Sequence, residues 1–440
     1  MSHYRRLRGR PDLLAVHRCD PDTWPFLLDS ASRGGSLGRW SILMRADPDR
    51  APIVASMNSV DEFLPRLDRA FDSERCIQPG RLPFEGGWFV YLGYELIGEI
   101  EPRLELRQVP DGTPRALARR CNAALILDHE TGDAYAVAEA PELLAVIADE
   151  AAGAVSMPDS SGDIGLPRMR PDDAERFMRG VERIREYIKA GDVFQVNLSR
   201  AWEGLTETAP DPVEVYRRLS ASNPAPFAGL ARLPGGTLLS SSPERLVSVH
   251  GRVIEARPIA GTRPRGDSVE RDRALSTELL GHPKERAEHI MLIDLERNDL
   301  GRLCTPGTVQ VDELMIVESY AHVHHIVSNI RGWLRDDVSP ADVIRACFPG
   351  GTITGCPKVR CMEIIAELET AGRGFYTGSM GYLGLDGRMD LNILIRSMLV
   401  SEHDIRFRTG AGIVADSEPA AELAETEAKA RGLMRALNPA

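Results

Sequence analysis

The sequence predicts an α+β fold, in which helices and strands follow one another without regular alternation. Hydrophobic residues make up 43% of the 440-residue chain, which is enough to form a sizeable core. Up to residue 152 short strand-like runs dominate, and beyond it helices and strands are mixed. Because a doubly wound parallel sheet requires steady β-α-β alternation, this irregular order favours the α+β class.

Turn signals divide the first region into short strands. Each predicted strand is an apolar or aromatic run, and the last precedes the acidic turn DHETGD. These strands cover residues 40–45, 87–92 and 123–127. A polar segment without periodicity follows, GAVSMPDSSGDIGLPRMRPD. We therefore expect an N-terminal region of residues 1–152, a linker of residues 153–172 and a second region of residues 173–440.

The second region begins with a predicted helix at residues 172–190. Its sequence, DDAERFMRGVERIREYIKA, starts with Asp and has apolar residues at helical spacing. Gly191 follows, a residue type that commonly ends helices. Further helices are predicted at residues 283–295 and 418–437, and strands at residues 237–239 and 246–250.

Charge and composition exclude several classes of function. Lys and Arg number 53 against 65 Asp and Glu, and the resulting net charge of −12 argues against nucleic-acid binding. The chain has no apolar run of about 18 residues and no apolar stretch near its start, so neither a membrane span nor a secretory signal is expected. Seven scattered cysteines without zinc-type spacing favour free thiols in a reducing, cytoplasmic environment. A small anionic substrate remains compatible, because a metal or a few local cations can override the overall charge.

Two glycine-rich motifs resemble nucleotide-binding loops but lack the required context. GGTITG at residues 350–355 has P-loop spacing, but CPK follows where Lys-Ser/Thr is needed, and a helix is expected before it. GAGIVA at residues 410–415 follows a predicted strand, but only about 25 residues remain for the rest of a dinucleotide fold. Either loop could instead bring backbone N–H groups toward another anion.

Two pairs of glutamates lie at i, i+3 spacing in predicted helices. Glu285 and Glu288 form one pair, and Glu422 and Glu425 form the other, so each pair shares one helix face. If the faces converge, the four carboxylates need a cation to stay ionised, and oxygen ligands suit Mg²⁺. The alternative is a solvated acidic face, although the apolar run after Glu288 places that helix against a core.

Three histidines, His322, His324 and His325, lie close together in SYAHVHHIVSNIRG. In a strand, the first two would share one face and His325 would take the other. Neighbours on opposite faces cannot chelate one ion, so their spacing alone favours packing or hydrogen bonding.

A series of motifs runs in order through the second region and spans about 240 residues. The motifs are AGDVFQVNLSR (190–200), SSPERLV (241–247), RPIAGTRPRG (257–266), KERAEHIMLIDLERNDLGR (284–302), HVHHIVS (322–328), FPGGTITGCPKVRCMEII (348–365), MDLNILIR (389–396) and GAGIVADSEPAAELAET (410–426). Together they resemble the chorismate-utilising enzymes: anthranilate synthase large subunits, aminodeoxychorismate synthase component I, and isochorismate and salicylate synthases. PFLLDSA (25–31) and FEGGWFVYLGYELIGEIEP (84–102) are similar to the N-terminal part of the amine-adding members.

The resemblance implies an anthranilate-synthase-like composite fold, with two antiparallel sheets forming a sandwich flanked by helices. It also implies that Glu288 and Glu425 are Mg²⁺ ligands, with Glu285 and Glu422 behind them through water. The metal would hold the ring carboxylate of chorismate.

The resemblance further implies the groups that hold the enolpyruvyl carboxylate, through a bidentate Arg and a nest of backbone amides. These groups are Tyr376, Arg396, Lys429, Gly410, Ala411 and Gly412.

Proton transfer and pocket lining follow from the same similarity. Ala260, Gly261 and Thr262 match positions at the pocket. Glu244 and His325 match a pair that handles protons, which the reaction needs because hydroxide is a poor leaving group from C4 of the ring.

Gln195 distinguishes two branches of the family. The water-adding members resemble this chain except for a lysine at this position, which acts as a base toward water. Glutamine cannot act as that base. The sequence therefore favours an enzyme that adds ammonia at C2 or C4.

The residue at position 260 and three other motifs point to different ammonia-adding members. Most aminodeoxychorismate synthases have a lysine there that attacks C2, whereas Ala260 is shared with anthranilate synthases and cannot be a nucleophile. FQVNL with Asn197, PGGTITG with Gly351, and MDLN at residues 389–392 are closer to the aminodeoxychorismate branch. We therefore expect aminodeoxychorismate synthase component I, which serves 4-aminobenzoate and folate biosynthesis, with anthranilate synthase component I as the alternative.

Ammonia is expected from a separate glutaminase subunit, since no G-x-C-x-G cysteine elbow occurs in the sequence. PFLLDSASRGG, which contains Ser30, resembles a tryptophan-binding strand and marks a possible tryptophan site. A minor alternative is a non-catalytic homologue that holds chorismate or an amino acid. It is disfavoured because the implied metal ligands and the proton-handling pair are all retained.

Overall fold

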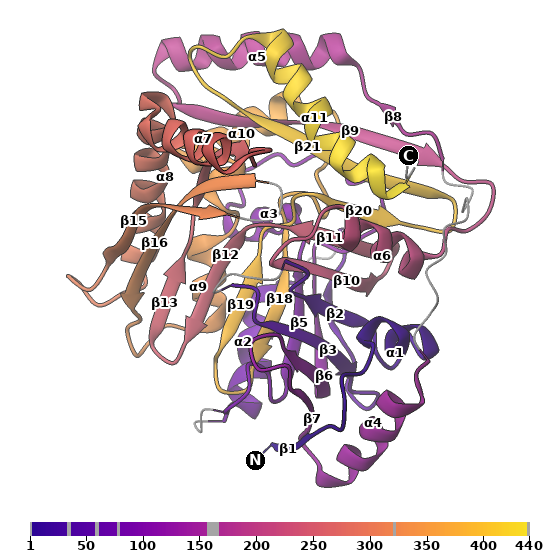
Figure 1. The fold of residues 1–440 in the computed structure, drawn as a ribbon. Helices are drawn as coiled ribbons and strands as arrows, with labels where there is room; N and C mark the ends of the chain where they lie inside the picture. Colours follow the sequence, from indigo (N-terminus) through magenta and orange to yellow (C-terminus); the bar gives the residue numbers. More distant parts are fainter. Residues whose placement is uncertain are drawn as a thin grey trace.

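The structure, a computed structural model, describes residues 2–32, 37–57, 61–76, 80–155, 167–319 and 323–437. It confirms the α+β class, because helices cover antiparallel sheets (Figure 1). Residues 156–166, which form most of the predicted linker, and His322 lie outside the described residues.

One antiparallel sheet combines strands from distant parts of the chain. Its strands are β1 His3–Arg6, β2 Phe26–Asp29, β3 Trp40–Ala46, β6 Ala116–Asp128, β7 Ala134–Ala138, β8 Arg170–Pro171, β9 Gln195–Leu205, β10 Phe227–Leu233, β11 Gly236–Ser242, β17 Gly355–Cys356, β20 Ser397–Val400 and β21 Asp404–Ile413. In spatial order they run β8–β9–β21–β20–β11–β10–β2–β3–β6–β7–β1. The short β17 pairs with the start of β9, on the strand edge that β8 occupies further along.

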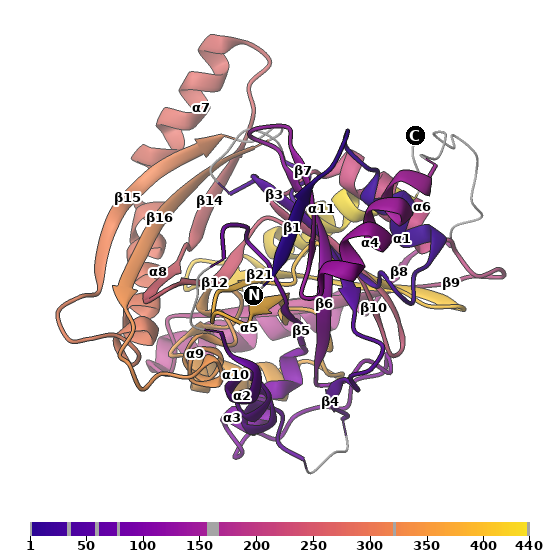
Figure 2. The same cartoon turned by 90° about the horizontal axis from the view of Figure 1, so that it is seen from below.

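A second antiparallel sheet starts from the same β6. Its other strands are β4 Ile53–Ala55, β5 Gly87–Leu92, β12 Arg245–His250, β13 Val253–Ala256, β14 Ile259–Pro264, β15 Gln310–Ser319, β16 Val323–Trp333, β18 Ser379–Gly384 and β19 Met389–Asn392. The order is β6–β5–β18–β19–β12–β13–β16–β15, with β14 following β13 along β16 and β4 on the other edge of β6. Figure 2 shows β15 and β16 as a long ribbon that extends away from the rest of the sheet.

The long strand β6 joins the two sheets. Its residues 116–121 pair with β4 and β5, whereas its residues 123–127 pair with β3 and β7. The sheets enclose an apolar core to which β2, β3, β10 and β11 contribute from one side and β5 and β18 from the other. This is the sandwich that the family resemblance implies.

Helices cover both outer faces. The helices that pack with the first sheet are α1 Leu13–Cys19, α4 Pro141–Gly153, α6 Pro212–Ser222 and α11 Pro419–Leu437. Those that pack on the second sheet and on the adjacent end of β9 and β21 are α2 Phe63–Glu74, α3 Ile97–Ile100, α5 Ala174–Ala190, α8 Pro283–Gly301, α9 Pro340–Cys347 and α10 Lys358–Leu368. The helix α7, Val269–Gly281, lies against β14, β16 and α8, and 3₁₀ turns occur at η1 Tyr94–Leu96 and η2 Gly351–Ile353.

Local signals in the sequence find α5 accurately. The Asp173 side chain accepts a hydrogen bond from the backbone N–H of Glu175, and Gly191 ends the helix with φ +84°. Such caps depend on nearby residues only, which is why sequence detects them. By contrast, β6 begins at Ala116 rather than at the predicted residue 123, because its first half is defined by pairing with β4 and β5.

The fold brings α8, α11, β9 and β21 to one end of the molecule, where most of the predicted site residues lie (Figure 1). In the described part of the chain, every helix is too short or too polar to span a bilayer.

Candidate active site

The predicted residues come from elements that are far apart in sequence. Gln195 begins β9, Glu285 and Glu288 lie early in α8, and Glu422, Glu425 and Lys429 lie on α11. The remaining residues are placed on β14 (Ala260, Gly261, Thr262), β16 (His325), β21 (Gly410, Ala411, Gly412) and the connections between strands or helices (Glu244, Tyr376, Arg396).

Gln195 connects β9 to α8. Its amide Nε2 donates a 2.9 Å hydrogen bond to Oε1 of Glu288, and the residue is only 5% exposed. This bond sets the orientation of the amide, and its other atom, Oε1, is buried without a hydrogen-bond partner. A Cβ at Gly412 would lie 2.3 Å from Nε2, so the missing side chain at Gly412 makes room for the amide.

Gly261 allows α8 to approach β14. Its φ of +63° lies in the left-handed region, and a Cβ on it would lie 2.7 Å from Oε2 of Glu285 and 2.9 Å from Cδ1 of Leu279. Arg263 donates a 3.1 Å hydrogen bond to Oε1 of the same Glu285. The missing side chain of Gly261 therefore leaves room for the first turn of α8. Arg263 compensates the negative charge of the Glu285 carboxylate.

Lys429 connects α11 to β21. Its Nζ lies 2.8 Å from Oε1 of Glu425 and donates a 2.8 Å hydrogen bond to the carbonyl oxygen of Gly410. A Cβ at Gly410 would lie 2.7 Å from both Oη of Tyr376 and Oδ1 of Asn197. The lysine and the tyrosine therefore both lie close to Gly410 on β21.

Glu244 has the acidity of a proton donor that works near neutral pH. Burial raises its pKa to about 7, while the Thr352 hydroxyl and the charges of Arg396 and Lys429 act in the opposite direction. The residue is 6% exposed, and its Oε1 has no hydrogen-bond partner. At pH 7 about half of the molecules therefore carry a proton on this carboxyl group.

His325 is neutral at pH 7 and, like Glu244, is influenced by the charge of Arg396. It pairs with Thr262 across β14 and β16 and is buried. Burial and the charge of Arg396 lower its pKa to about 4, although a hydrogen bond with the Gly261 backbone acts in the opposite direction. Of the predicted proton-handling pair, Glu244 is thus the member that carries a proton at neutral pH.

The other described histidine of the cluster has a structural role. His324 places Nε2 at 2.9 Å from Oδ1 of Asp272 and Nδ1 at 2.8 Å from the hydroxyl of Ser319.

The four glutamates have the chemistry of a magnesium site but are not gathered on one point. Within the ranges that the structure describes, no three His, Cys, Asp or Glu side chains are close enough to share a metal ion. Glu288 is bound by Gln195, while Glu285 and Glu425 face the cations Arg263 and Lys429. Carboxylate oxygens on two helices that reach the paired strands β9 and β21 nevertheless fit Mg²⁺ in ligand type.

The glycine motif at residues 410–415 is not a loop. Residues 410–413 complete β21 and pair with β9, for example Gly410 with Ser199 and Gly412 with Asn197. These residues belong to a strand ladder rather than to a loop, and the role of their backbone amides toward the enolpyruvyl carboxylate stays a prediction. The glycines instead allow Gln195 and Tyr376 to approach the strand.

Two features of the site were missed by the sequence. The GGTITG segment, dismissed as a phosphate loop, follows α9 and places Thr352 against Glu244. A nucleotide-binding pattern gives no sign of this role of Thr352. The role depends on a contact with Glu244, which lies between β11 and β12, about 100 residues earlier in the chain.

A buried ion-pair network behind Tyr376 is the second missed feature. The Arg373 guanidinium donates to Oε1 of Glu369 at 2.8 Å and to the carbonyl oxygen of Asn197 at 2.7 Å. Arg408 lies 2.9 Å from the other oxygen of Glu369. The two cations lower the pKa of Glu369 despite its burial.

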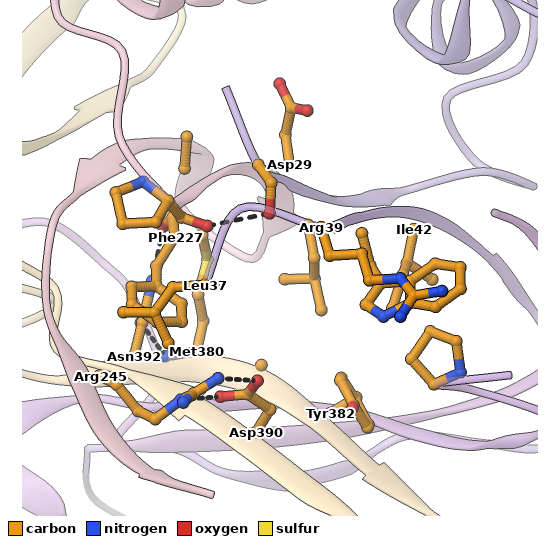
Figure 3. A pocket seen from close by; sticks show the side chains of 17 residues that line it. Asp29, Leu37, Arg39, Ile42, Phe227, Arg245, Met380, Tyr382, Asp390 and Asn392 are labelled. Atoms are coloured by element: carbon orange, nitrogen blue, oxygen red, sulfur yellow. Dashed lines mark hydrogen bonds and ion pairs between the residues drawn. The ribbon is translucent and has the colours of Figure 1, made fainter. Parts of the chain in front are cut away.

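Ser30 lines a separate cavity of about 280 Å³, between strands of the two sheets (Figure 3). Its hydroxyl donates a 3.1 Å hydrogen bond to the carbonyl oxygen of Pro226. Asp29 accepts hydrogen bonds from the hydroxyls of Ser41 and Tyr216, at 2.7 and 3.0 Å. Figure 3 also shows the paired Arg245 and Asp390, whose two hydrogen bonds are each 2.9 Å long. The possible tryptophan site thus coincides with a cavity, distinct from the residues around Gln195.

Comparison with known proteins gives consistent matches. The family of chorismate binding enzymes matches residues 40–435. An anthranilate synthase component I-like protein of Synechocystis sp. is 45% identical over 82% of this chain and 74% of its own length. Aminodeoxychorismate synthase component 1 of Bacillus subtilis is 47% identical, but over 64% of this chain and 58% of its own. The structure of anthranilate synthase component I from Streptococcus pneumoniae superposes with a TM-score of 0.80, at 31% identity, covering 90% of this chain and 92% of that one.

Proposed function

Because this chain belongs to the family of chorismate binding enzymes, we propose that it aminates chorismate with ammonia, as aminodeoxychorismate synthase component I. The observation that carries the choice of ammonia is the hydrogen bond between Gln195 and Glu288. A base that deprotonates water would have to stand here, and an amide cannot do so. The unpartnered Oε1 of Gln195 can instead accept an N–H bond of ammonia and orient its lone pair.

Amination at C4 is supported by Asn197 together with the Gly351 and 389–392 motifs. The Oδ1 atom of Asn197 is also buried without a hydrogen-bond partner, beside Gly410 and Tyr376. Asn197 lies two residues after Gln195 on β9, so the two side chains point to the same face of the strand. Two amide oxygens on one strand face suit a nucleophile whose N–H groups must be held.

The alternative is anthranilate synthase component I, in which ammonia enters at C2 and pyruvate is lost. Ala260 favours it, as do relatives that match most of this chain, such as the Streptomyces coelicolor anthranilate synthase component 1, 37% identical over 96% of this chain and 85% of its own. Without a lysine at position 260, amination at C4 would proceed without a lysine adduct.

The substrate would be bound by groups already described. Lys429, Tyr376 and Arg396 would hold the enolpyruvyl carboxylate, since Lys and Arg supply charge and hydrogen bonds. Glu288 and Glu425, backed by Glu285 and Glu422, would hold Mg²⁺, which neutralises the ring carboxylate when bound.

Glu244 would supply the proton that the reaction needs. The C4 hydroxyl leaves as water when it takes this proton, and a C–N bond forms as the C–O bond breaks. The new amine gives up its extra proton, which restores Glu244. His325, neutral at pH 7, would accept or relay that proton beside Arg396.

The nitrogen source proposed for the cell is a separate glutaminase subunit. The word "component" in the relatives' names supports it, since it implies a second chain.

The test is to supply chorismate, Mg²⁺ and ammonium to the purified chain. We expect a product that yields 4-aminobenzoate only after a separate lyase is added. Strong anthranilate fluorescence with stoichiometric pyruvate from this chain alone would favour the alternative instead.

A further inference from the structure

One buried arginine, Arg373, contacts several segments that carry proposed site residues. It is 2% exposed and lies in the connection between α10 and β18. A guanidinium group has five N–H donors, and all five of Arg373 donate hydrogen bonds of 3.2 Å or less. Two of them go to the two oxygens of Glu369, from Nε at 3.1 Å and from Nη2 at 2.8 Å. Three donors therefore remain for groups outside this ion pair.

These three donors reach three separate segments. Nη2 donates a 2.7 Å hydrogen bond to the carbonyl oxygen of Asn197 on β9. Nη1 donates to the carbonyl oxygen of Ile353 at 3.1 Å and to the hydroxyl of Thr377 at 3.2 Å. Ile353 follows Thr352, which contacts the proposed proton donor, and Thr377 follows Tyr376. One side chain thus joins β9, the η2 turn and the Tyr376 segment.

The backbone at Thr377 has a conformation that a β-branched residue rarely adopts, with φ +61° in the left-handed region. Its hydroxyl, which accepts from Arg373, donates a 2.5 Å hydrogen bond to the carbonyl oxygen of Tyr376. Its backbone N–H donates a 2.8 Å bond to the carbonyl oxygen of Leu394. Two residues beyond Leu394, Arg396 also has a positive φ, of +51°. Such conformations cost free energy and persist where surrounding contacts hold them, typically at functional sites.

The guanidinium group also lies beside two aromatic rings. Its Cζ is 5.6 Å from the ring centroid of Tyr376 and 4.9 Å from that of Tyr94. The Tyr376 hydroxyl lies next to Gly410, as described above. Glu95, which follows Tyr94, accepts a 2.7 Å hydrogen bond from the backbone N–H of Arg373. Contacts on both the backbone and the side chain therefore fix the position of this arginine.

We propose that Arg373 is a positioning residue, which holds the Tyr376 hydroxyl and the Asn197 amide where they meet the substrate. The proposal rests on the proposed function, in which Tyr376 binds the enolpyruvyl carboxylate and Asn197 faces ammonia. Arg373 acts through these residues rather than on the substrate, because its five N–H donors are already used. A lysine has only three donors, so it leaves at least two of the five acceptors without their hydrogen bonds.

Arg373→Lys tests the role, with Arg120→Lys as the matched control. Arg120 is also buried, at 5% exposure. Its hydrogen bonds go to Glu74, to Glu139 and to two backbone carbonyl oxygens, all within the N-terminal region. The two variants therefore remove comparable buried hydrogen bonds, and only Arg373→Lys removes them from the proposed site.

The variants and the unaltered chain are compared at a temperature at which each is folded. The measurements are kcat and KM for chorismate with Mg²⁺ and ammonium, chorismate binding by calorimetry, and melting temperature. We expect both substitutions to lower the melting temperature. Only Arg373→Lys should also raise KM and the dissociation constant for chorismate, by tenfold or more. The change in kcat should be smaller, because the enolpyruvyl carboxylate does not react.

Two substitutions at Thr377 test the same connection while the guanidinium group is kept. Thr377→Val keeps the branched shape but removes the hydroxyl that lies between Arg373 and the Tyr376 carbonyl oxygen. Thr377→Ser keeps this hydroxyl. We expect Thr377→Val to raise KM for chorismate threefold or more, and Thr377→Ser to stay within twofold of the unaltered chain. If Arg373→Lys fails to fold, this pair decides the question.

A double variant tests whether Arg373 acts through Tyr376. When combined with Tyr376→Phe, Arg373→Lys should raise KM by a smaller factor than it does alone, because the hydroxyl that it positions is absent.

Several results would overturn the positioning role. They are folded Arg373→Lys and Thr377→Val variants with unaltered KM and chorismate binding, an equal rise in KM in the Arg120→Lys control, or fully multiplicative effects of Arg373→Lys and Tyr376→Phe. If the unaltered chain bound chorismate without aminating it, the proposed function would fail, and the binding measurements would still test the positioning role. If it did not bind chorismate, both would fail.

Discussion

Replacing Glu244 with glutamine should make the enzyme much less active and, at alkaline pH, more stable. The Glu244 carboxyl group is buried. The charges of Arg396, Lys429 and Glu296 act on it. Burial outweighs the two cations and raises its pKa from 4.5 to about 7. At about 1.4 kcal/mol for each tenfold change, this difference corresponds to about 3 kcal/mol against the ionised form.

The sign of the stability effect follows from the raised pKa. Below pH 4.5 the carboxyl group is protonated, and its burial carries no penalty in folding free energy from ionisation. This penalty grows as the pH rises toward 7 and is complete above it. Glutamine has the same shape and no charge, so Glu244→Gln should remove the penalty. The variant should therefore gain up to about 3 kcal/mol in unfolding free energy at pH 8.5 and nothing at pH 4.5.

Activity should change in the opposite direction. If Glu244 donates a proton, kcat/KM of the unaltered enzyme should fall about tenfold per pH unit above pH 7. Glu244→Gln should lower kcat by about 10²–10⁴-fold and abolish this alkaline limb. Urea unfolding at the two pH values and a pH–rate profile measure both effects. A variant that keeps the alkaline limb, or that is no more stable at pH 8.5, would refute the assigned role and the buried charge respectively.

Three further predictions concern the frame of the site. Gly261→Ala should destabilise the protein by about 2–5 kcal/mol, because it adds backbone strain and a clash with Glu285. Gly251→Ala is the control, because Gly251 also has a positive φ of +61° but its Cβ would meet no neighbouring atom. It should cost only about 1 kcal/mol of unfolding free energy. Equal losses in the two variants would refute the clash at Gly261. Glu369→Gln leaves two buried guanidinium groups uncompensated and should cost about 3–5 kcal/mol, measured by chemical unfolding; a loss below 1 kcal/mol would contradict that account. Glu288→Gln keeps an oxygen for the Gln195 amide, so its melting temperature should stay unchanged while Mg²⁺-dependent turnover is lost; turnover that survives would contradict its role as a metal ligand.

The sequence predicts local features of this chain better than distant pairings. The caps of α5 and the paired glutamates are determined by residues within a few positions of each other, and the structure places them on helices as expected. The GAGIVA motif was expected to form a loop after a strand, but its pairing with β9 extends the strand through it. Thr352 and Arg373 gain their roles from contacts with residues far away in sequence, which no short pattern encodes.

The family resemblance contributed what spacing alone could not. From spacing alone, each glutamate pair could be either part of a metal site or a solvated acidic face. Spacing also assigned no separate roles to the three histidines. The structure then separates His325, which lies beside Arg396, from His324, which is bound by Asp272. It also shows that Gln195 on β9 donates a hydrogen bond to Glu288 on α8, so the residue proposed to select ammonia contacts a proposed metal ligand.

The central claim, amination at C4 by ammonia, is tested most directly by the mass of the product. The enzyme is incubated with chorismate, Mg²⁺ and ammonium labelled with heavy nitrogen, and the products are analysed by mass spectrometry. The account predicts a labelled product that retains the enolpyruvyl group, with no free pyruvate. A labelled product that has lost the enolpyruvyl group, or an unlabelled hydroxylated isomer of chorismate, would contradict it.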